Sequence, residues 1–192
     1  MRRSVLYSDF NCPFCYAMHE RLHDSGLMQA VEWRGVQHAP HLPTPMQRWS
    51  GHLGAELRQE VTVVRRLAPE LSIVVPKGKP NTRAAIEAAI RALRMDAAGA
   101  AGFIRSLYRL FWVEGKDISD PEILQEAGQR QGFEPGRIAS PSAEDVSPIV
   151  ERWAAGWADA EHAGVPLLER EDRCILVGLV AVEEIQGFLA HH

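Results

Sequence analysis

The sequence lacks several features that would place it in a specialised class of protein. Nowhere in its 192 residues is there an apolar run of about 18 residues, the length a transmembrane helix needs. Its basic residues are scattered rather than clustered, and the formal net charge is −4. Membrane surfaces and nucleic acids are therefore not expected as partners.

The amino terminus lacks the apolar stretch of a secretory signal. Arg2 and Arg3 would suit the basic start of such a signal, but an acidic residue follows already at Asp9. We therefore expect the protein to act in the cytoplasm, where thiols are kept reduced. In that compartment a cysteine pair is expected to be catalytic or metal-binding rather than a structural disulfide.

The spacing of apolar residues predicts an α/β fold. Short apolar runs predict strands at 4–9, 31–37, 165–168 and 174–177, and helices are expected at 13–23 and 181–189. Between the second and third strands, apolar residues recur every three or four positions, which is typical of amphipathic helices. The helices expected in this block lie at about 83–94, 99–113, 121–131 and 148–162.

Two of the three cysteines, Cys12 and Cys15, stand in a C-x-x-C pattern where the first strand gives way to a helix. Pro13 suits the first helical turn, because its missing N–H has no bond to make there. The positive end of the helix dipole favours a thiolate at Cys12, and the thiolate is the nucleophilic form. We expect Cys12 to attack a disulfide and Cys15 to resolve the mixed disulfide.

The C-x-x-C pattern leaves two structural alternatives open. It supplies half of a zinc site, which would need Cys174 and a histidine such as His19 for completion. A second half with regular spacing is missing, so no metal is expected. The other alternative is a structural disulfide, which the expected reducing compartment disfavours.

Other chemically conspicuous residues are interpreted as structural. Cys174 precedes an apolar run and is expected to fill the core or a strand edge. His38 and His41 could line the mouth of a site, but we interpret both as exposed loop residues outside the catalytic set. The spacing of the tryptophans favours packing roles, as for Trp33, Trp153 and Trp157.

Three segments together resemble a known family. The segment 8–16, which reads SDFNCPFCY, resembles the active-site segment of DsbA-like thioredoxin-fold oxidoreductases. Residues 164–166 resemble the family's cis-proline loop, and 111–120 resemble its helical insertion. The resemblance implies a thioredoxin-like α/β fold with a large all-helical insertion between the second and third strands. It divides the chain into a first thioredoxin-like part at 1–45, an insertion at 46–162 and a second thioredoxin-like part at 163–192.

The resemblance also implies a substrate site around the cysteines. Pro13 and Phe14 are its substrate-binding residues between the cysteines, and Val165 and Pro166 line the groove for an extended substrate backbone. The dipeptide Pro13-Phe14 lacks the histidine of strongly oxidising DsbA proteins and resembles the Cys-Pro-aromatic-Cys of glutaredoxins. This difference implies a less oxidising couple.

Two other functions fit the same resemblance. The extended family includes glutathione-dependent isomerases that resemble 2-hydroxychromene-2-carboxylate isomerase, and kappa-class glutathione transferases, which carry serine where Cys12 stands. Segments 81–83 and 117–120 resemble theirs, but such an isomerase has no need for Cys15, so the pair favours redox chemistry. A thioredoxin-fold module that binds peptides without catalysis is the third reading.

The expected partner is a thiol or disulfide substrate, either a protein or glutathione. Glutathione is the candidate co-substrate, and no bound cofactor is expected. A monomer and a homodimer both fit the sequence.

Overall fold

The computed structural model describes residues 3–134, 136–140, 143–160 and 164–190. Within them, four strands form one sheet, in the order β2-β1-β3-β4. The first elements are β1 (Ser4–Ser8), α1 (Pro13–Asp24), a short 3₁₀ helix (Met28–Ala30) and β2 (Val31–Gly35). The helices that follow are α2 (Gly51–Leu67), α3 (Arg83–Met95), α4 (Ala97–Trp112), α5 (Pro121–Arg130) and α6 (Ser147–Asp159). The chain then forms β3 (Leu167–Glu169), β4 (Ile175–Val177) and α7 (Val182–Ala190).

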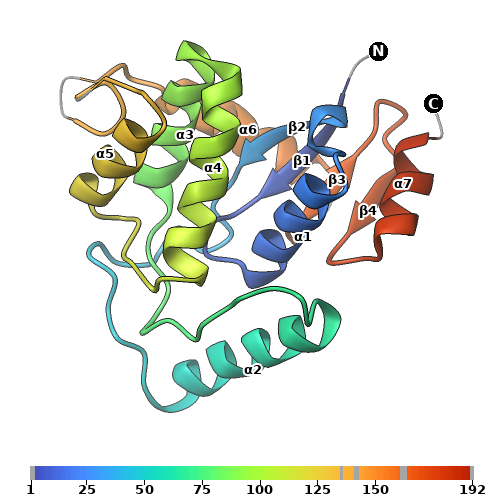
Figure 1. The fold of residues 1–192 in the computed structure, drawn as a ribbon, viewed down its shortest axis with the longest axis horizontal. Helices are drawn as coiled ribbons and strands as arrows, with labels where there is room; N and C mark the ends of the chain where they lie inside the picture. The colour runs from blue at the N-terminus through green and yellow to red at the C-terminus, as the bar shows by residue number, and fades with distance from the viewer. Residues whose placement is uncertain (1–2, 135, 141–142, 161–163, 191–192) are drawn as a thin grey trace.

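The central strand β1 organises the sheet. It runs parallel to β2, with Leu6 opposite Trp33, and antiparallel to β3, with Leu6 opposite Leu168. The β3–β4 pair is antiparallel as well. Figure 1 shows α1 in front of this sheet and α6 behind it. The predicted thioredoxin-like fold, with helices inserted between the second and third strands, is confirmed.

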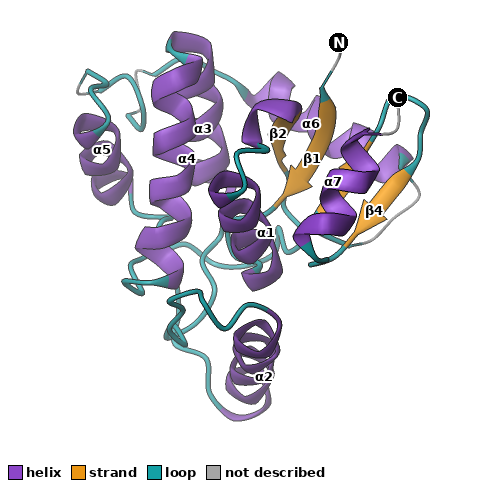
Figure 2. Ribbon diagram, turned by 45° about the vertical axis from the view of Figure 1, so that its right-hand side comes forward, coloured by secondary structure: helices purple, strands orange, loops and turns teal. Residues whose placement is uncertain are grey.

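The inserted helices do not form one uniform layer. Helices α3, α4 and α5 pack side by side at one end of the sheet, and α4 also contacts α1. Helix α2 lies at the margin of the molecule, below the other elements in both ribbon views (Figure 2). Helix α6 packs against β2, where Trp153 meets Trp33 edge-on with ring centres 6.0 Å apart. The boundaries at 46 and 162 remain a prediction.

Aromatic side chains fill the space between the sheet and α4. Phe10 packs against the rings of Trp33 and Tyr108, with centroids 5.3 and 4.7 Å apart. The indole N–H of Trp112 donates a 2.8 Å hydrogen bond to the Phe10 carbonyl. This bond fastens the segment between β1 and α1 to the end of α4. The packing role expected for Trp33 and Trp153 is confirmed, since both are buried.

Several predicted element ends were wrong by one to three residues, and local contacts explain one of them. The second strand ends at Gly35 rather than at residue 37, and the Val36 N–H then bonds to the Ser8 carbonyl. A Cβ at Gly35 would lie 2.5 Å from the Trp33 ring, so the strand passes too close to its neighbours for a larger residue. Helix α6 ends at Asp159, and the predicted positions 161 and 162 lie outside the described residues. Among the described helices, none is long and apolar enough to cross a bilayer.

A buried carboxylate joins α1 to α4. Glu20 is 2% exposed and accepts hydrogen bonds of 3.0 and 2.9 Å from the Arg105 guanidinium. Arg109 contacts the same carboxylate at 3.2 Å. A bidentate pair of this kind fixes geometry as well as charge, and a buried carboxylate needs such partners. The contact therefore holds the helix that begins at the cysteines against the helical insertion.

Replacing Arg105 with Met should lower the free energy of unfolding by about 2 kcal/mol, because a buried charge loses its bidentate partner. Urea unfolding followed by circular dichroism measures the change. Arg130→Met is the matched control: its pair with Glu126 is about 60% exposed on both sides and should contribute under about 0.5 kcal/mol. Equal losses in the two variants would contradict this assignment.

Candidate active site

Cys12 lies at the amino-terminal end of α1. Its backbone is extended, with φ −99° and ψ 120°, and its carbonyl accepts the first helical bond, 3.1 Å from the Tyr16 N–H. Pro13 is the first helical residue, as its missing N–H allows. The Cys12 Sγ lies 3.6 Å from the Val165 carbonyl oxygen, to which the thiol donates. The sulfur is thus placed between a helix start and the loop ahead of β3.

Cys15 lies deeper than Cys12. Its exposed fraction is 0%, against 6% for Cys12, and both are free thiols. The Asp9 N–H donates to the Cys15 Sγ at 3.4 Å, and the Ser8 hydroxyl also bonds to it. A substrate can therefore reach Cys12 more readily than Cys15.

The two thiols have opposite acid–base character. Burial by itself would raise the pKa of Cys12, but hydrogen bonds from the side chain and backbone N–H of Cys15 act against this effect. Positive charge at His38 and Lys79 acts in the same direction, so the pKa of Cys12 lies below its ordinary value. Burial and the neighbouring Cys12 charge raise the pKa of Cys15 well above its ordinary value. The arrangement therefore places the more acidic thiol, Cys12, beside the less acidic one, Cys15.

The predicted substrate-binding residues come together around this pair. Pro13 is buried, whereas Phe14 is partly exposed on the helix start. The Val165–Pro166 peptide bond is cis, and the Pro166 carbonyl accepts a 2.8 Å bond from the Gly178 N–H. Val165 contacts the Cys12 sulfur with its backbone carbonyl oxygen. The substrate-binding roles of these four residues remain predictions.

His38 belongs to this site, and its interpretation as an exposed loop residue is wrong. Its side chain is 27% exposed, and its Nδ1 lies 2.7 Å from the fully buried Asp9 carboxylate. Burial by itself would lower the pKa of His38, but the hydrogen bond and charge of Asp9 raise it above the ordinary value. His41 is exposed, as expected.

The order and direction of the strands could have predicted that His38 lies at this site. Because β1 and β2 are parallel, the segments that follow both strands leave the sheet at the same edge. Cys12 follows β1 and His38 follows β2, so the two residues converge. Lys79, which the sequence analysis does not single out, reaches the same place from the segment before α3 and pairs with Glu60 at 2.6 Å.

A chain of buried polar groups continues behind Cys15. The Ser8 hydroxyl lies 2.5 Å from the Tyr108 hydroxyl, which also accepts a 3.4 Å bond from the Trp33 indole N–H. Burial, followed by the charge of Cys15, raises the pKa of Tyr108 well above its ordinary value. His19 stacks on Tyr108 with centroids 4.9 Å apart, and burial lowers its pKa to about 4. His19 is thus a neutral packing residue of the core.

Cys174 does not fill the core. It is exposed in the turn just before the edge strand β4, where its N–H bonds to Asp172. The turn is polar, since the Arg170 and Asp172 side chains form an ion pair in it. The Cys174 thiol therefore stays exposed rather than buried. Among the described residues, no group of three or more His, Cys, Asp or Glu side chains is arranged to hold a metal ion.

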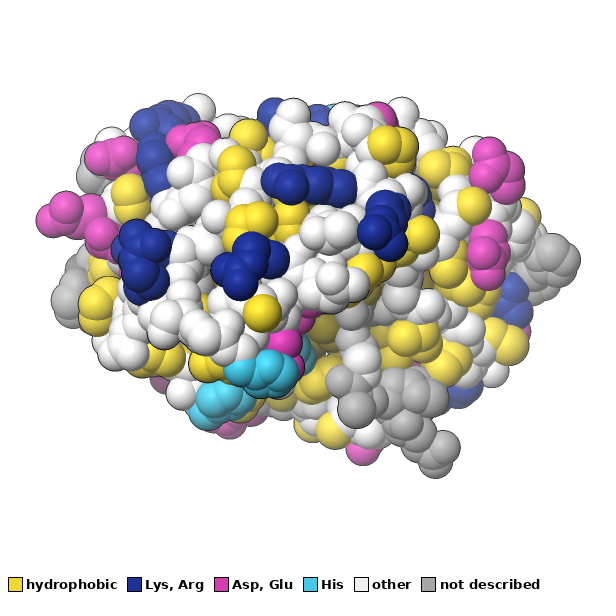
Figure 3. Space-filling model, turned by 90° about the horizontal axis from the view of Figure 1, so that it is seen from below, with side chains coloured by type: hydrophobic (Ala, Val, Ile, Leu, Met, Phe, Trp, Pro, Cys, Tyr) yellow, Lys and Arg dark blue, Asp and Glu magenta, His cyan; other side chains and the backbone are white. Residues whose placement is uncertain are grey.

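A cavity of about 510 Å³ opens beside the thiol site. His38 and Lys79 line it together with His41, Arg48 and Trp49, and none of its described lining residues is acidic. The face that carries α2 is shown in Figure 3, where Lys and Arg side chains are spread over the surface and histidines gather near its lower edge. The cavity therefore presents basic side chains, and its link to the thiols runs through His38 and Lys79, whose positive charges act on Cys12.

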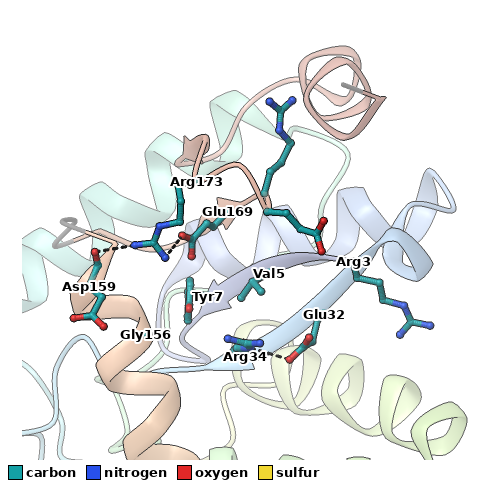
Figure 4. Close-up of a pocket in the computed structure, with 11 residues that line it drawn as sticks. Arg3, Val5, Tyr7, Glu32, Arg34, Gly156, Asp159, Glu169 and Arg173 are labelled. Carbon is teal, nitrogen blue, oxygen red and sulfur yellow. Dashed lines mark hydrogen bonds and ion pairs between the residues drawn. The ribbon is translucent and has the colours of Figure 1, made fainter. Parts of the chain in front are cut away.

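A larger cavity of about 730 Å³ has a different character. Val5 and Tyr7 of β1 line it, together with charged side chains of both signs. Its charges are largely paired: Figure 4 shows Arg34 joined to Glu32 and Arg173 joined to Glu169. Size alone therefore does not identify the functional cavity.

The family model of the DSBA-like thioredoxin domain matches residues 5–190, nearly the whole chain. The chain belongs to the DsbA-like thioredoxin family. No curated protein sequence matches this DsbA-like chain significantly.

Solved structures share the DsbA-like fold at low sequence identity. A probable DsbA oxidoreductase from Streptomyces coelicolor is 18% identical, with a TM-score of 0.75, over 97% of this chain and 88% of that one. The cytosolic disulfide reductase DsbM from Pseudomonas aeruginosa, solved with GSH, is 17% identical, with a TM-score of 0.71, over 98% and 97%. A 2-hydroxychromene-2-carboxylate isomerase is 16% identical, with a TM-score of 0.66, over 98% and 94%. At these identities the likeness concerns the fold.

Replacing Cys15 with Ala should raise the pKa of Cys12 by about one unit, because the Cys12 sulfur loses the hydrogen bond from the Cys15 side chain and keeps only the one from the backbone N–H at position 15. The rate of Cys12 alkylation by iodoacetamide, followed by mass spectrometry across pH, measures this pKa. A Cys174→Ser background removes the exposed third thiol from the signal. An unchanged or lower pKa in Cys15→Ala would refute the role assigned to Cys15.

Proposed function

We propose that this DsbA-like chain is a thiol-disulfide oxidoreductase, with Cys12 as nucleophile and Cys15 as resolving thiol. The observation that carries the proposal is the pair itself: two free thiols in hydrogen-bond contact at a helix start, with the pKa of the outer one lowered and that of the inner one raised. An attacking group must be ionised and reachable, whereas a resolving group must stay protonated until the mixed disulfide forms.

The reaction follows from this asymmetry. The Cys12 thiolate attacks one sulfur of a substrate disulfide, the substrate S–S bond breaks, and the other substrate sulfur leaves as a thiolate that takes up a proton. Cys15 then loses its proton and attacks the Cys12 sulfur, which releases the second substrate thiol. Formation of the Cys12–Cys15 disulfide releases two electrons, and these electrons reduce the substrate disulfide to two thiols. The reverse sequence oxidises a substrate dithiol.

The substrate is either a protein disulfide or a glutathione disulfide. The Val165 carbonyl beside Cys12, in the loop just before β3, supports docking of an extended backbone at this loop. The positive cavity lined by His38, Arg48 and Lys79 supports a substrate with carboxylates, such as glutathione. The relative DsbM, a cytosolic disulfide reductase solved with GSH, is consistent with glutathione as co-substrate and with a cytoplasmic location.

One observation favours a second candidate function. A cationic cavity next to a lowered-pKa thiol also suits a glutathione-dependent isomerase or transferase acting on a small aromatic acid. In such an enzyme Cys15 has no redox step to perform. The two readings therefore differ in whether activity depends on Cys15.

The test is equilibration of the Cys174→Ser protein with glutathione buffers of graded ratio, followed by alkylation and mass analysis. We expect one two-electron transition in which Cys12 and Cys15 oxidise together. Cys12→Ser should abolish exchange with a substrate disulfide, because the attacking sulfur is gone. Cys15→Ser should accumulate a mixed disulfide on Cys12, because nothing resolves it.

Two outcomes would reject the oxidoreductase proposal. One is a stable glutathione adduct on Cys12 of the protein that still has Cys15, without a Cys12–Cys15 disulfide at any buffer ratio. The other is full function in Cys12→Ser, which would leave peptide binding without catalysis as the explanation. Retained turnover of an aromatic substrate in Cys15→Ser would favour the isomerase.

A further inference from the structure

The Asp9 carboxylate is completely buried and depends on His38. Its Oδ2 accepts two hydrogen bonds from that one residue, 2.9 Å from the backbone N–H and 2.7 Å from the ring Nδ1. Within the described part of the chain, its Oδ1 accepts one weak hydrogen bond, from the Asn11 N–H at 3.5 Å. Burying a carboxylate costs free energy unless a partner compensates its charge. A carboxylate that accepts a bond from an imidazole ring favours the protonated, positively charged form of that ring.

Asp9 also contacts both cysteines through its backbone. Its carbonyl accepts a 3.2 Å bond from the Cys12 N–H, and its N–H donates to the Cys15 sulfur at 3.4 Å. One residue therefore links the loop after β2 to the redox pair.

Few charged groups share this space. The groups that act on His38 are Asp9 from the segment after β1, Cys12 from the start of α1, and Lys79 from the segment before α3. Lys79 is paired with Glu60 of α2. His41 and Arg48 line the same cavity and carry no negative charge. The anions that an imidazolium at His38 meets are thus the Asp9 carboxylate and the Cys12 thiolate.

We propose that His38, oriented by Asp9, is a positioning residue for the redox pair: its positive charge stabilises the Cys12 thiolate and so makes the couple a stronger oxidant. The inference rests on the proposed oxidoreductase function. A thiolate exists only in the reduced protein, so any charge that stabilises it favours reduction of the Cys12–Cys15 disulfide. In the reduced protein the charge at His38 faces a thiolate, and in the disulfide form this partner is lost.

The balance of the reaction stays that of thiol–disulfide exchange. The reduced pair, as one thiolate and one thiol, gives two electrons and the Cys15 proton to a partner disulfide, which becomes one thiol and one thiolate. His38 enters this balance through its charge. Its removal therefore shifts the equilibrium and the pKa of Cys12 without abolishing exchange.

Three variants in the Cys174→Ser background separate charge from structure. His38→Gln removes the titratable charge, whereas the backbone N–H at position 38 still donates to Asp9. His38→Lys restores a positive charge at the same position. His52→Gln is the matched control, because His52 is an exposed histidine of α2 that does not line this cavity.

We expect His38→Gln to raise the pKa of Cys12 by about one unit, measured by alkylation across pH. In glutathione buffers, the oxidised form should be favoured about tenfold more than in the parent protein, a midpoint about 30 mV more negative for a two-electron couple. His38→Lys should return both values toward those of the parent. His52→Gln should leave both values within error.

Other outcomes overturn the proposal in distinguishable ways. If His38→Gln leaves the pKa of Cys12 and the midpoint unchanged, the His38 inference is wrong and the oxidoreductase function stands. If His38→Lys shifts both values as far as His38→Gln does, with both variants folded by circular dichroism, the role of His38 is structural. If the parent shows no two-electron transition, the proposed function fails, and the alkylation profile still decides whether His38 acts on Cys12.

Discussion

The buried Asp9 carboxylate is the constraint on which the arrangement of this site depends. It has no exposed surface, so it must be neutralised from within the protein, and His38 supplies both of its short hydrogen bonds. The backbone of the same residue contacts both cysteines. The need to compensate one buried charge therefore determines where the loop after β2 lies relative to the thiols.

The two thiols differ because their surroundings differ, although they are only three residues apart. Cys12 ends the extended segment and meets the helix start, positive charge and the hydrogen bonds of Cys15. Cys15 lies one helical turn inside, against Ser8 and the Asp9 backbone, with no exposed surface. Desolvation acts on both sulfurs, but only Cys12 has enough compensation to favour its charged form. The asymmetry needed for a nucleophile and a resolving thiol thus arises from the local fold.

The helical insertion has a structural part in this chemistry. Helix α4 holds α1 through the contacts of Arg105 and Arg109 with Glu20, and Trp112 holds the Phe10 carbonyl just before the cysteines. The loop between β2 and α2 forms the cationic cavity, and Lys79 reaches it from the segment between α2 and α3. The insertion therefore both rigidifies the thiol segment and shapes the space that a substrate would enter.

The sequence by itself determined the order of strands and helices and the position of the C-x-x-C at a helix start. It also determined the resemblance of residues 8–16 to the DsbA-like family. These features depend on the periodicity of apolar residues, the placement of proline and the spacing of cysteines, which are all local properties of the chain. It did not determine that His38 belongs to the site or that Cys174 is exposed. Between the cysteines stands Pro13-Phe14, without a histidine, and the histidine that acts on Cys12 comes from the loop after β2. Only the parallel pairing of β1 with β2 brings residues 12 and 38 to one edge, since such contacts depend on register and topology rather than on neighbouring residues.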